Sequence, residues 1–288
     1  MAPRPRALLA GLTVLSALAC AAPASAAGDA AVAALQVGLR AKGVYAGTVD
    51  GVLGPETSEA VRKLQRRAGL AVDGVPGANT RAALGRYGRP GLGKRMLAGR
   101  VVGWDVAQLQ FLLAWQGFPS GPLDGHFGPR TEAAVRRFQT WTGLAADGVV
   151  GPSTLSALRA APPASPIPLD WPLDVPVTDL FGPRGNRFHT GIDFPAPTGT
   201  PVAAAGAGRV KYAGHLKGGW GLVVTIAHGS GVRTMYAHLS RIDVKLGAGV
   251  PAGARVGLVG ATGRATGPHL HFEVRLRGAA IDPLTAPR

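Results

Sequence analysis

The feature that most constrains the fold is an internal repeat. Residues 32–84 align with residues 106–158 at a constant offset of 74, without a gap, and about half of the aligned positions are identical. The series Asp-Gly-x-x-Gly-Pro-x-Thr occurs at residues 50–57 and again at residues 124–131. Self-similarity at a fixed period means that one structural unit is built more than once. The N-terminal half of the chain is therefore predicted to contain two copies of one small module.

The hydrophobic pattern within each copy is helical. In the first copy Val32, Leu35 and Leu39 recur at steps of three and four residues, which places them on one buried helix face. Gly43 ends this helix, and the Gly-Pro at residues 54–55 opens a second one, because a proline in the first turn needs no N–H. A short third helix is expected over residues 80–84. Each copy is thus predicted to be a three-helix all-α module.

The residues shared by the two copies form the series L-Q…G…D-G-x-x-G-x-x-T…A-V-x-x-x-Q…G-L…D-G. This series resembles the type 1 peptidoglycan-binding domain, and the resemblance covers both copies nearly from end to end. It implies affinity for the glycan or the stem peptide of the cell wall. The alternative is that the modules only space the chain or pack against the rest of it. The match identifies framework positions, so it names no binding residues.

The N-terminus has the order of a secretory signal peptide. Two arginines precede an apolar stretch over residues 7–19, and Ala24-Ser25-Ala26 follows. The stretch is too short to favour a membrane-spanning helix. We expect cleavage after Ala26, an exported, cell-wall-associated chain, and no stable membrane insertion afterwards. The single cysteine, Cys20, leaves one alternative open, a lipoprotein acylated at this residue.

The chain is strongly basic. It has 31 Lys and Arg against 16 Asp and Glu, a net charge of +15, and aromatic residues make up only 6%. The charge is spread without long runs, whereas nucleic-acid binders concentrate it on one element and add stacking aromatics. We therefore expect no nucleic-acid partner. Separately, the protein is expected to be a monomer. Positive charge would favour encounter with an anionic cell envelope, although solubility explains it equally well.

Changes in composition divide the chain. Six prolines fall within residues 160–176, which favours an extended, semi-rigid segment, and glycines between residues 86 and 103 indicate a more flexible joint. The predicted organisation is a signal peptide at 1–26, a first module at 27–86, a linker at 87–103, a second module at 104–160, a Pro-rich linker at 161–176 and a third domain at 177–288.

The third domain is predicted to be antiparallel and all-β. Short runs with strand character occur at residues 222–227, 232–238, 255–259 and 269–274. Gly-rich turns separate them, as is typical of a sheet built from many short strands.

Six of the seven histidines lie in this domain. His269 and His271 alternate with apolar residues, so a strand would place both imidazoles on one face. His189 and Asp193 lie four residues apart around Gly191, and they converge only if the backbone bends there. Two imidazoles and a carboxylate form a common catalytic zinc set with one position open for water, although other divalent metals fit too.

The order of these motifs carries a second resemblance. Phe-Gly-x-Arg at residues 181–184 precedes His-Thr-Gly-Ile-Asp at 189–193, Tyr-Ala-His-Leu at 236–239 and Gly-Pro-His-Leu-His-Phe-Glu at 267–273. The domain resembles the M23 family of zinc metallopeptidases, the lysostaphin/LytM-type cell-wall endopeptidases.

This resemblance implies the roles of five residues. It implies one zinc ion per catalytic domain, held by His189, Asp193 and His271, with His238 and His269 as catalytic histidines at the open position. Which of the two is the base is left open. Some relatives carry a tyrosine shortly before the first ligand, and residues 183–188 contain none here.

Three further side chains of this domain are polar and could have structural or functional roles. His228 is interpreted as structural and His215 as solvent-exposed. Glu273 is either a partner of a ligand imidazole or a solvated carboxylate at a strand edge.

Together these patterns predict a secreted cell-wall hydrolase, a zinc endopeptidase that cleaves peptide cross-links or stem peptides of peptidoglycan. The alternatives are a non-catalytic M23-like activator of another wall hydrolase and a pure wall-binding protein. No motif indicates which peptide bond is cut.

Overall fold

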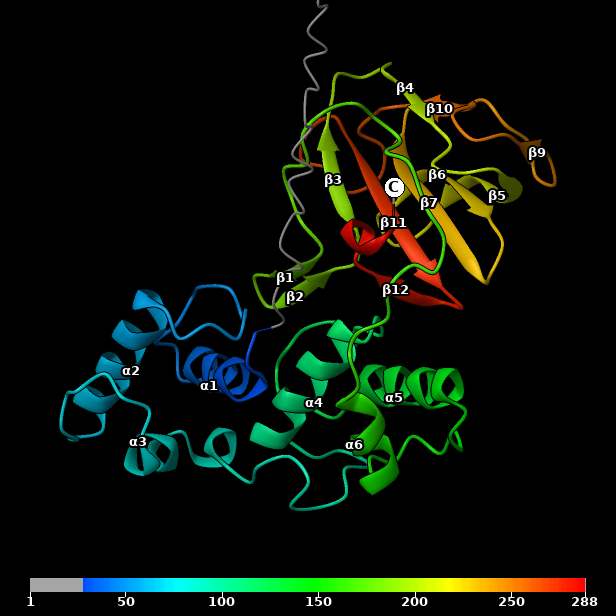
Figure 1. Ribbon diagram of the computed structural model, residues 1–288. Coiled ribbons are helices and arrows are strands. Elements are labelled where there is room, and N and C mark those ends of the chain that lie inside the picture. The colour runs from blue at the N-terminus through cyan, green and yellow to red at the C-terminus, as the bar shows by residue number, and fades with distance from the viewer. Residues whose placement is uncertain (1–27, 288) are drawn as a thin grey trace, which may run out of the picture.

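The computed structural model describes residues 28–287, and the expected signal peptide and Cys20 lie outside this range. Within it a helical part precedes a β domain (Figure 1). The first repeat contains α1 (Ala30–Ala41), α2 (Pro55–Arg67), α3 (Ala78–Ala83) and the 3₁₀ helix η1 (Gly85–Gly88), and the second contains α4 (Trp104–Trp115), α5 (Pro129–Thr142) and α6 (Pro152–Leu158). The fold class predicted from the sequence, two three-helix modules followed by an antiparallel all-β domain, is confirmed.

The identical residues of the two repeats form buried hydrogen-bonded latches. The amide of Gln36 on α1 donates to Asp50 and Thr57 and accepts from the N–H of Gly51. The amide of Gln110 on α4 makes the same three bonds to Asp124, Thr131 and Gly125. A buried amide with its partners satisfied fixes the loop against the helix. The Asp-Gly-x-x-Gly-Pro-x-Thr series is therefore a structural framework in each repeat.

A second latch closes each repeat in the same way. Gln65 on α2 bonds Asp73, Gly74 and Thr80, and the next repeat contains the equivalent set, Gln139 with Asp147, Gly148 and Thr154.

Helix α4 is the centre of the helical part, and nearly all of its residues are buried. Leu109 and Leu113 face α5 and α6 in the apolar core of the second repeat. Phe111 and Trp115 belong to the larger core that also contains α1 and the interior of the β domain. One apolar core therefore joins the first repeat, one face of α4 and the β domain, and the second repeat has a core of its own on the other face of α4.

The β domain contains twelve strands among the described residues. They are β1 (Gly182–Arg184), β2 (Arg187–His189), β3 (Ile192–Pro195), β4 (Pro201–Ala203), β5 (Gly208–Leu216), β6 (Gly221–Ala227), β7 (Val232–Leu239), β8 (Arg241–Ile242), β9 (Gly249–Val250), β10 (Arg255–Leu258), β11 (His269–Leu276) and β12 (Ala279–Ile281). A seven-stranded sheet has the order β12-β11-β7-β6-β5-β9, and all its pairs are antiparallel. Strand β3 pairs with the first half of β11, on the same edge that pairs with β12 farther along. The three-stranded sheet β4-β10-β8 and the hairpin β1–β2 complete the domain.

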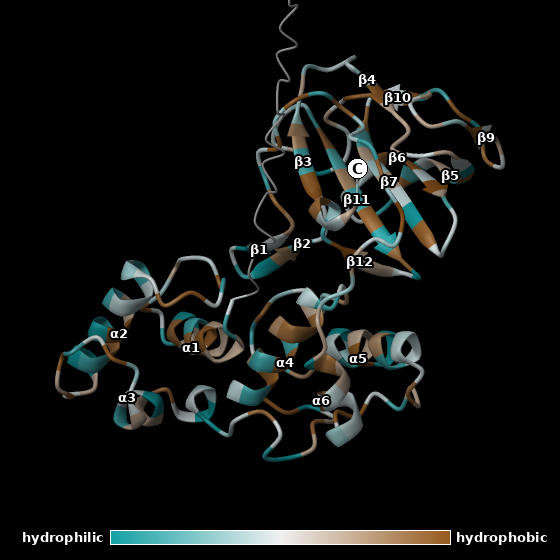
Figure 2. Ribbon diagram, in the orientation of Figure 1, coloured by the Kyte–Doolittle hydropathy of each residue, from teal (hydrophilic) through white to brown (hydrophobic). Residues whose placement is uncertain are grey.

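Alternation along the central strands positions the core. Leu270, Phe272 and Val274 of β11 are fully buried in the apolar interior, and Figure 2 shows apolar and polar residues alternating along β7 and β11. Side chains of successive residues point to opposite faces of a strand. His269 and His271 therefore lie on the other face of β11, as the sequence pattern predicts.

The segments expected to be linkers are packed. In the first, Arg95 pairs with the buried Asp105, and Leu97 forms a β-bridge with Val150. In the Pro-rich segment Leu169 and Leu173 are buried in the core of the β domain. The first linker thus packs on the second repeat and the Pro-rich segment on the β domain, although the composition of both segments favours modules on a tether.

The part of the chain that the structure describes contains no helix long and apolar enough to cross a bilayer.

Candidate metal centre

Strand pairing brings the candidate metal ligands together. Strands β3 and β11 are antiparallel, and their register places Asp193 directly opposite His271. Directly opposed residues in an antiparallel pair have side chains in contact. The chain turns between β2 and β3, and a Cβ added at Gly191 would lie 2.2 Å from the carbonyl oxygen of Phe272. Only glycine permits this approach, and the turn brings His189 to the same point.

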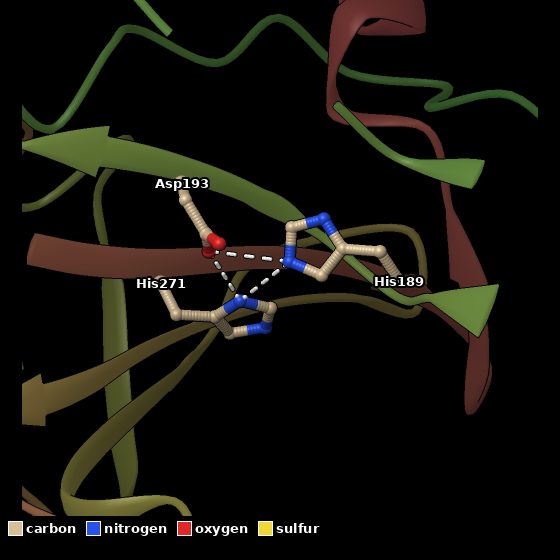
Figure 3. Close-up of side chains that lie close together, drawn as sticks. All are labelled: His189, Asp193 and His271. Carbon is tan, nitrogen blue, oxygen red and sulfur yellow. Dashed lines mark hydrogen bonds and ion pairs between the residues drawn. The ribbon is translucent and has the colours of Figure 1, made fainter. Parts of the chain in front are cut away.

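The three ligand atoms form a tight triangle (Figure 3). Nε2 of His189 lies 3.2 Å from Oδ1 of Asp193 and 3.0 Å from Nδ1 of His271, and the third side, between His271 Nδ1 and Asp193 Oδ1, is 2.8 Å. All three residues are buried. Among the described residues this is the one group of His, Cys, Asp and Glu side chains close enough to hold a metal ion together.

Hydrogen bonds behind the triangle orient both imidazoles. Nδ1 of His189 lies 2.8 Å from the carbonyl oxygen of Leu180. A carbonyl oxygen can only accept, so Nδ1 carries the proton and Nε2 is left as the lone-pair atom facing the other ligands. Nε2 of His271 lies 3.2 Å from the fully buried carboxylate of Glu273, which leaves Nδ1 for the triangle.

Glu273 is itself held in place. It accepts hydrogen bonds from Arg275 Nε at 2.6 Å and from the hydroxyl of Thr190. Of the two roles considered for this residue, the structure shows the contact with a ligand imidazole and excludes a solvated edge carboxylate.

The charges in the cluster support one another. Burial alone would raise the pKa of Asp193, but its close contacts with the imidazoles of His189 and His271 outweigh burial and hold that pKa far below its usual range. Burial would lower the pKa of His271, yet the hydrogen bonds to Asp193 and Glu273 raise it to about 9. For Glu273 burial is opposed by His271 and Arg275, which lower its pKa to about 2. The carboxylates are therefore ionised at neutral pH.

The donor set fits a divalent metal such as zinc. The ligand atoms of a tetrahedral zinc ion at about 2.0–2.1 Å lie roughly 3.3–3.4 Å from one another. The three separations in the triangle are only slightly shorter, at 2.8–3.2 Å. Two imidazole nitrogens and one carboxylate oxygen also match the ligand types that zinc accepts, and a buried carboxylate supporting a ligand imidazole is the usual second contact.

Two further histidines stand beside the triangle. The rings of His238 on β7 and His269 on β11 have centroids 4.7 Å apart. Nδ1 of His238 lies 2.8 Å from the carbonyl oxygen of Thr262, and Nδ1 of His269 lies 2.9 Å from that of Gly267. Each Nδ1 therefore carries the proton, and each Nε2 is free to accept one. Burial lowers the pKa of His238 and favours its neutral form. Its backbone has φ +61°, an uncommon conformation that is concentrated at functional sites.

The five residues border one cleft of about 750 Å³. Trp220 is a cleft residue that sequence reasoning did not identify, and its ring lies 5.2 Å from that of His271. It stands in a glycine-rich loop, where no periodicity or motif marks it. Two exposed arginines, Arg187 and Arg264, also line the cleft and make no ion pair with any described residue.

The remaining histidines of the domain lie away from the cleft lining. His228 bonds the carbonyl oxygen of Ala207 and the hydroxyl of Thr234, which is a structural role, and His215 is exposed. Arg184 does contact the site, because it pairs with Asp179 at 2.6 Å and reaches Asp193 at 3.3 Å.

An antiparallel β domain with a buried His-Asp-His triangle and two free imidazoles at an open cleft has the arrangement of a metal-dependent hydrolase. Comparison with known proteins narrows this class. Residues 187–283 match peptidase family M23, and residues 28–84 and 103–158 match the putative peptidoglycan binding domain. The C-terminal domain of the chain belongs to peptidase family M23, and the two repeats are peptidoglycan-binding domains.

Relatives share the C-terminal part. The chain is 50% identical over 99 residues to the DD-carboxypeptidase/endopeptidase Mpg of Neisseria meningitidis serogroup B, which covers 34% of this chain and 23% of the relative. It is 44% identical over 117 residues to the peptidoglycan DD-endopeptidase ShyA of Vibrio cholerae, covering 38% and 24%. The chain thus spans about a quarter of the length of these curated relatives.

A solved structure of a zinc-containing peptidase from Vibrio cholerae is 38% identical, with a TM-score of 0.39, over 41% of this chain and 40% of that one.

Proposed function

We propose that this protein is a secreted zinc endopeptidase that hydrolyses peptide bonds in peptidoglycan. The observation that carries the proposal is the triangle of His189, Asp193 and His271 beside two histidines with free Nε2 atoms in one cleft. The names of the relatives describe peptidoglycan endopeptidases, and the shared part of the chain is the part that contains the cleft.

His189, Asp193 and His271 would hold the metal. When bound, the metal supplies a Lewis acid that polarises the scissile carbonyl and acidifies the attacking water.

The remaining chemistry falls to His238 and His269. A neutral imidazole whose Nδ1 donates to a backbone carbonyl has a basic Nε2, which takes the proton of the attacking water. The imidazole that has taken this proton then returns it to the departing amine. The second imidazole, when protonated at Nε2, donates to the oxygen of the carbonyl as charge develops there. The backbone carbonyls of Thr262 and Gly267 keep both rings in the required tautomer and orientation.

The charges of the cleft favour an anionic peptide. Its carboxylates are engaged, because Asp193 is a ligand and Asp179 pairs with Arg184. Arg187 and Arg264 are left without an acidic partner among the described residues. A guanidinium binds carboxylates in bidentate fashion. The proposed substrate is therefore a peptide with a free carboxylate close to the bond that is cut.

The organisation expected from the sequence is proposed for the mature chain, with modules at 27–86 and 104–160 and the peptidase domain at 177–288. The three family matches fall within or within one residue of these ranges. The two peptidoglycan-binding domains support the cell wall as the location and peptidoglycan as the partner. The peptidase domain is proposed to bind one zinc ion.

The decisive experiment incubates purified wall of several cross-link types with the protein and measures new amino groups, the masses of released fragments and bound zinc. We expect amine release by the wild type, loss of zinc and amine release in Asp193→Ala and His271→Ala, and wild-type behaviour in the control His215→Ala. Stoichiometric zinc in both ligand variants would refute the metal assignment. No amine release from any wall by the zinc-loaded wild type would favour an activator or a binding protein.

A further inference from the structure

The hairpin that carries His189 is held at its tip by both repeats. The N–H of Val49 donates to the carbonyl oxygen of Gly185 at 2.8 Å, and the N–H of Leu123 donates to that of Asn186 at 2.7 Å. Val49 and Leu123 occupy equivalent positions in the two repeats. The β1–β2 hairpin is a two-residue turn between three-residue strands, and so small a unit is not stable alone. It depends on its neighbours for its position.

The second repeat adds a side-chain contact that the first cannot make. The ring of Trp115, at the end of α4, lies 5.2 Å from that of Phe188 and 6.1 Å from that of Phe181, and those two rings are 5.0 Å apart. All three pairs meet edge to face, the arrangement that aromatic rings prefer. Phe188 directly precedes His189, and the two side chains point to opposite faces of β2. The aromatic cluster therefore lies behind the metal ligand.

The same repeat also holds the other ligand strand. The N–H of Ala280 on β12 donates to the carbonyl oxygen of Gly117 at 3.1 Å. A Cβ at Gly117, where φ is +88°, would lie 2.3 Å from the carbonyl oxygen of Ala280. Nε1 of Trp141 donates to the carbonyl oxygen of Leu276 on β11 at 3.1 Å. Strand β11, which carries His271, pairs with β12. The second repeat therefore forms hydrogen bonds with both β11 and β12.

Between these contacts the second repeat reaches the cleft. Pro119 and Gly121 are lining residues of the cleft that holds the five site residues. Nε1 of Trp115 and Oγ of Ser120 are the two buried side-chain polar atoms without a hydrogen-bond partner among residues 28–287. An atom of this kind is costly to leave unpaired, so each calls for a partner from outside the protein or for a local structural cause. In the first repeat the positions of Trp115, Ser120 and Trp141 are Ala41, Ala46 and Arg67.

We propose that the second repeat is part of the catalytic apparatus. Trp115 is a positioning residue that fixes the hairpin and with it His189, and the segment Pro119–Gly121 forms one side of the substrate cleft and contacts the peptide. This inference rests on the proposed function for its kinetic consequences, but the positioning role is independent of turnover. It differs from a role as a wall anchor, which would leave hydrolysis of a small soluble peptide unchanged.

The positioning role is tested in the full chain with Trp115→Ala, the conservative Trp115→Phe, and Leu109→Ala. Leu109 is fully buried in the second repeat's own core and does not contact the hairpin cluster, so Leu109→Ala is the control for loss of stability alone. Four quantities are measured below the unfolding midpoint of each variant: hydrogen–deuterium exchange of residues 182–189 without metal, zinc affinity by chelator competition, and kcat and KM on a soluble peptide.

We expect Trp115→Ala to speed hairpin exchange, weaken zinc binding and lower kcat, each by at least about tenfold, in line with losses seen when support of a metal ligand is removed. Trp115→Phe is expected to restore most of each quantity, and Leu109→Ala to leave all four near wild type. Wild-type exchange and zinc affinity in Trp115→Ala would overturn the positioning role, and so would equal losses in Leu109→Ala.

The cleft contact is tested by charge at Pro119. With an anionic peptide, Pro119→Glu is expected to raise KM several-fold, whereas Pro119→Lys is expected to leave it unchanged or lower it, with zinc affinity constant in both. Unchanged KM in both variants would overturn the cleft contact. A wild type that binds zinc but cleaves nothing would refute the proposed function, while exchange and zinc affinity in the Trp115 variants would still decide the positioning role.

Discussion

The two repeats have one framework and two different surfaces. Both are closed by the same buried glutamine latches, and both donate an equivalent backbone N–H to the hairpin tip. They differ in what their variable positions do. Trp115 of the second repeat packs on Phe188, next to the candidate ligand His189, where the first repeat has Ala41.

The first repeat exposes apolar side chains at positions that are buried in the second. In the first repeat Leu53 is 49% exposed, whereas its equivalent in the second, Phe127, is 2% exposed in the core. The first repeat also exposes Val52, Val72 and Val75. In Figure 1 helices α4 and α5 of the second repeat lie beneath the β domain, whereas α2 and α3 of the first repeat lie farther from it. The second repeat therefore has the surface that packs against the β domain, and the first has the larger exposed apolar surface, which we propose contacts the wall.

The largest effect on turnover is expected from variants of the β domain, which contains both candidate catalytic histidines. His269→Ala and His238→Ala should each lower kcat on the order of 10²–10⁴-fold, because each removes a positioned acid–base group. Zinc content and pelleting with insoluble wall should stay at the wild-type level, because neither side chain belongs to the ligand triangle. Zinc and amine release are measured on the same sample. Loss of zinc in His269→Ala would make this residue a ligand.

The next test uses a matched pair of latches. Gln36→Ala and Gln110→Ala each remove a fully satisfied buried amide at equivalent positions. Each should lower the free energy of unfolding by about 2–4 kcal/mol, because several buried partners lose their bonds. Activity on a soluble peptide, measured below the unfolding midpoint of each variant, should fall mainly in Gln110→Ala, because its amide holds residues 124 and 125, close to the segment Pro119–Gly121 that lines the cleft. Equal kinetic losses in the two variants would remove the distinction between the repeats.

The exposed apolar residues of the first repeat provide a smaller effect on binding alone. Changing Val52 and Leu53 together to Ser should weaken pelleting with wall several-fold, because apolar contact area is lost. Unfolding and cleavage of a soluble peptide should remain as in the wild type. Undiminished pelleting would show that this repeat binds through other residues or serves as a spacer.

The smallest effect concerns acid stability. Burial lowers the pKa of His228 in the β domain. Its contribution to the free energy of unfolding is therefore complete above the unfolded pKa of about 6.5 and is lost as the pH falls through the pKa of the folded state. In the repeats, hydrogen bonds from the N–H groups of Val75 and Val149 lower the pKa of Asp73 and Asp147. The contribution of these two carboxylates to the free energy of unfolding persists above about pH 3.9 and is lost only in stronger acid.

Thermal unfolding from pH 7 to pH 3 separates these two ranges. His228→Gln should lose less stability than the wild type between pH 7 and pH 5, and Asp147→Asn should flatten the curve only near pH 4 and below. If His228→Gln lost as much stability as the wild type between pH 7 and pH 5, other groups would be responsible for the loss in this range.

Local patterns in the sequence determined much of this molecule. The offset of 74 and the three- and four-residue steps predicted both helical modules, because helix faces repeat over a few residues. Alternation at residues 269–272 predicted that His269 and His271 share a strand face, and the register with β3 confirms the expected approach of Asp193. The bend expected at Gly191 is also present, since its backbone passes against Phe272.

Other features were decided only by the tertiary structure. Strand β5, the longest in the domain, was not predicted because its mixed polar and glycine residues have no clean period. Trp220 reaches the cleft from a loop, where no pattern fixes the direction of a side chain. The docking of Trp115 on Phe188 joins segments distant in sequence, and hydrophobic periodicity marks a residue as buried without naming its partner. Packing of whole modules against one another selects that partner, which is why the contact between the second repeat and the hairpin that carries His189 could be read only from the folded chain.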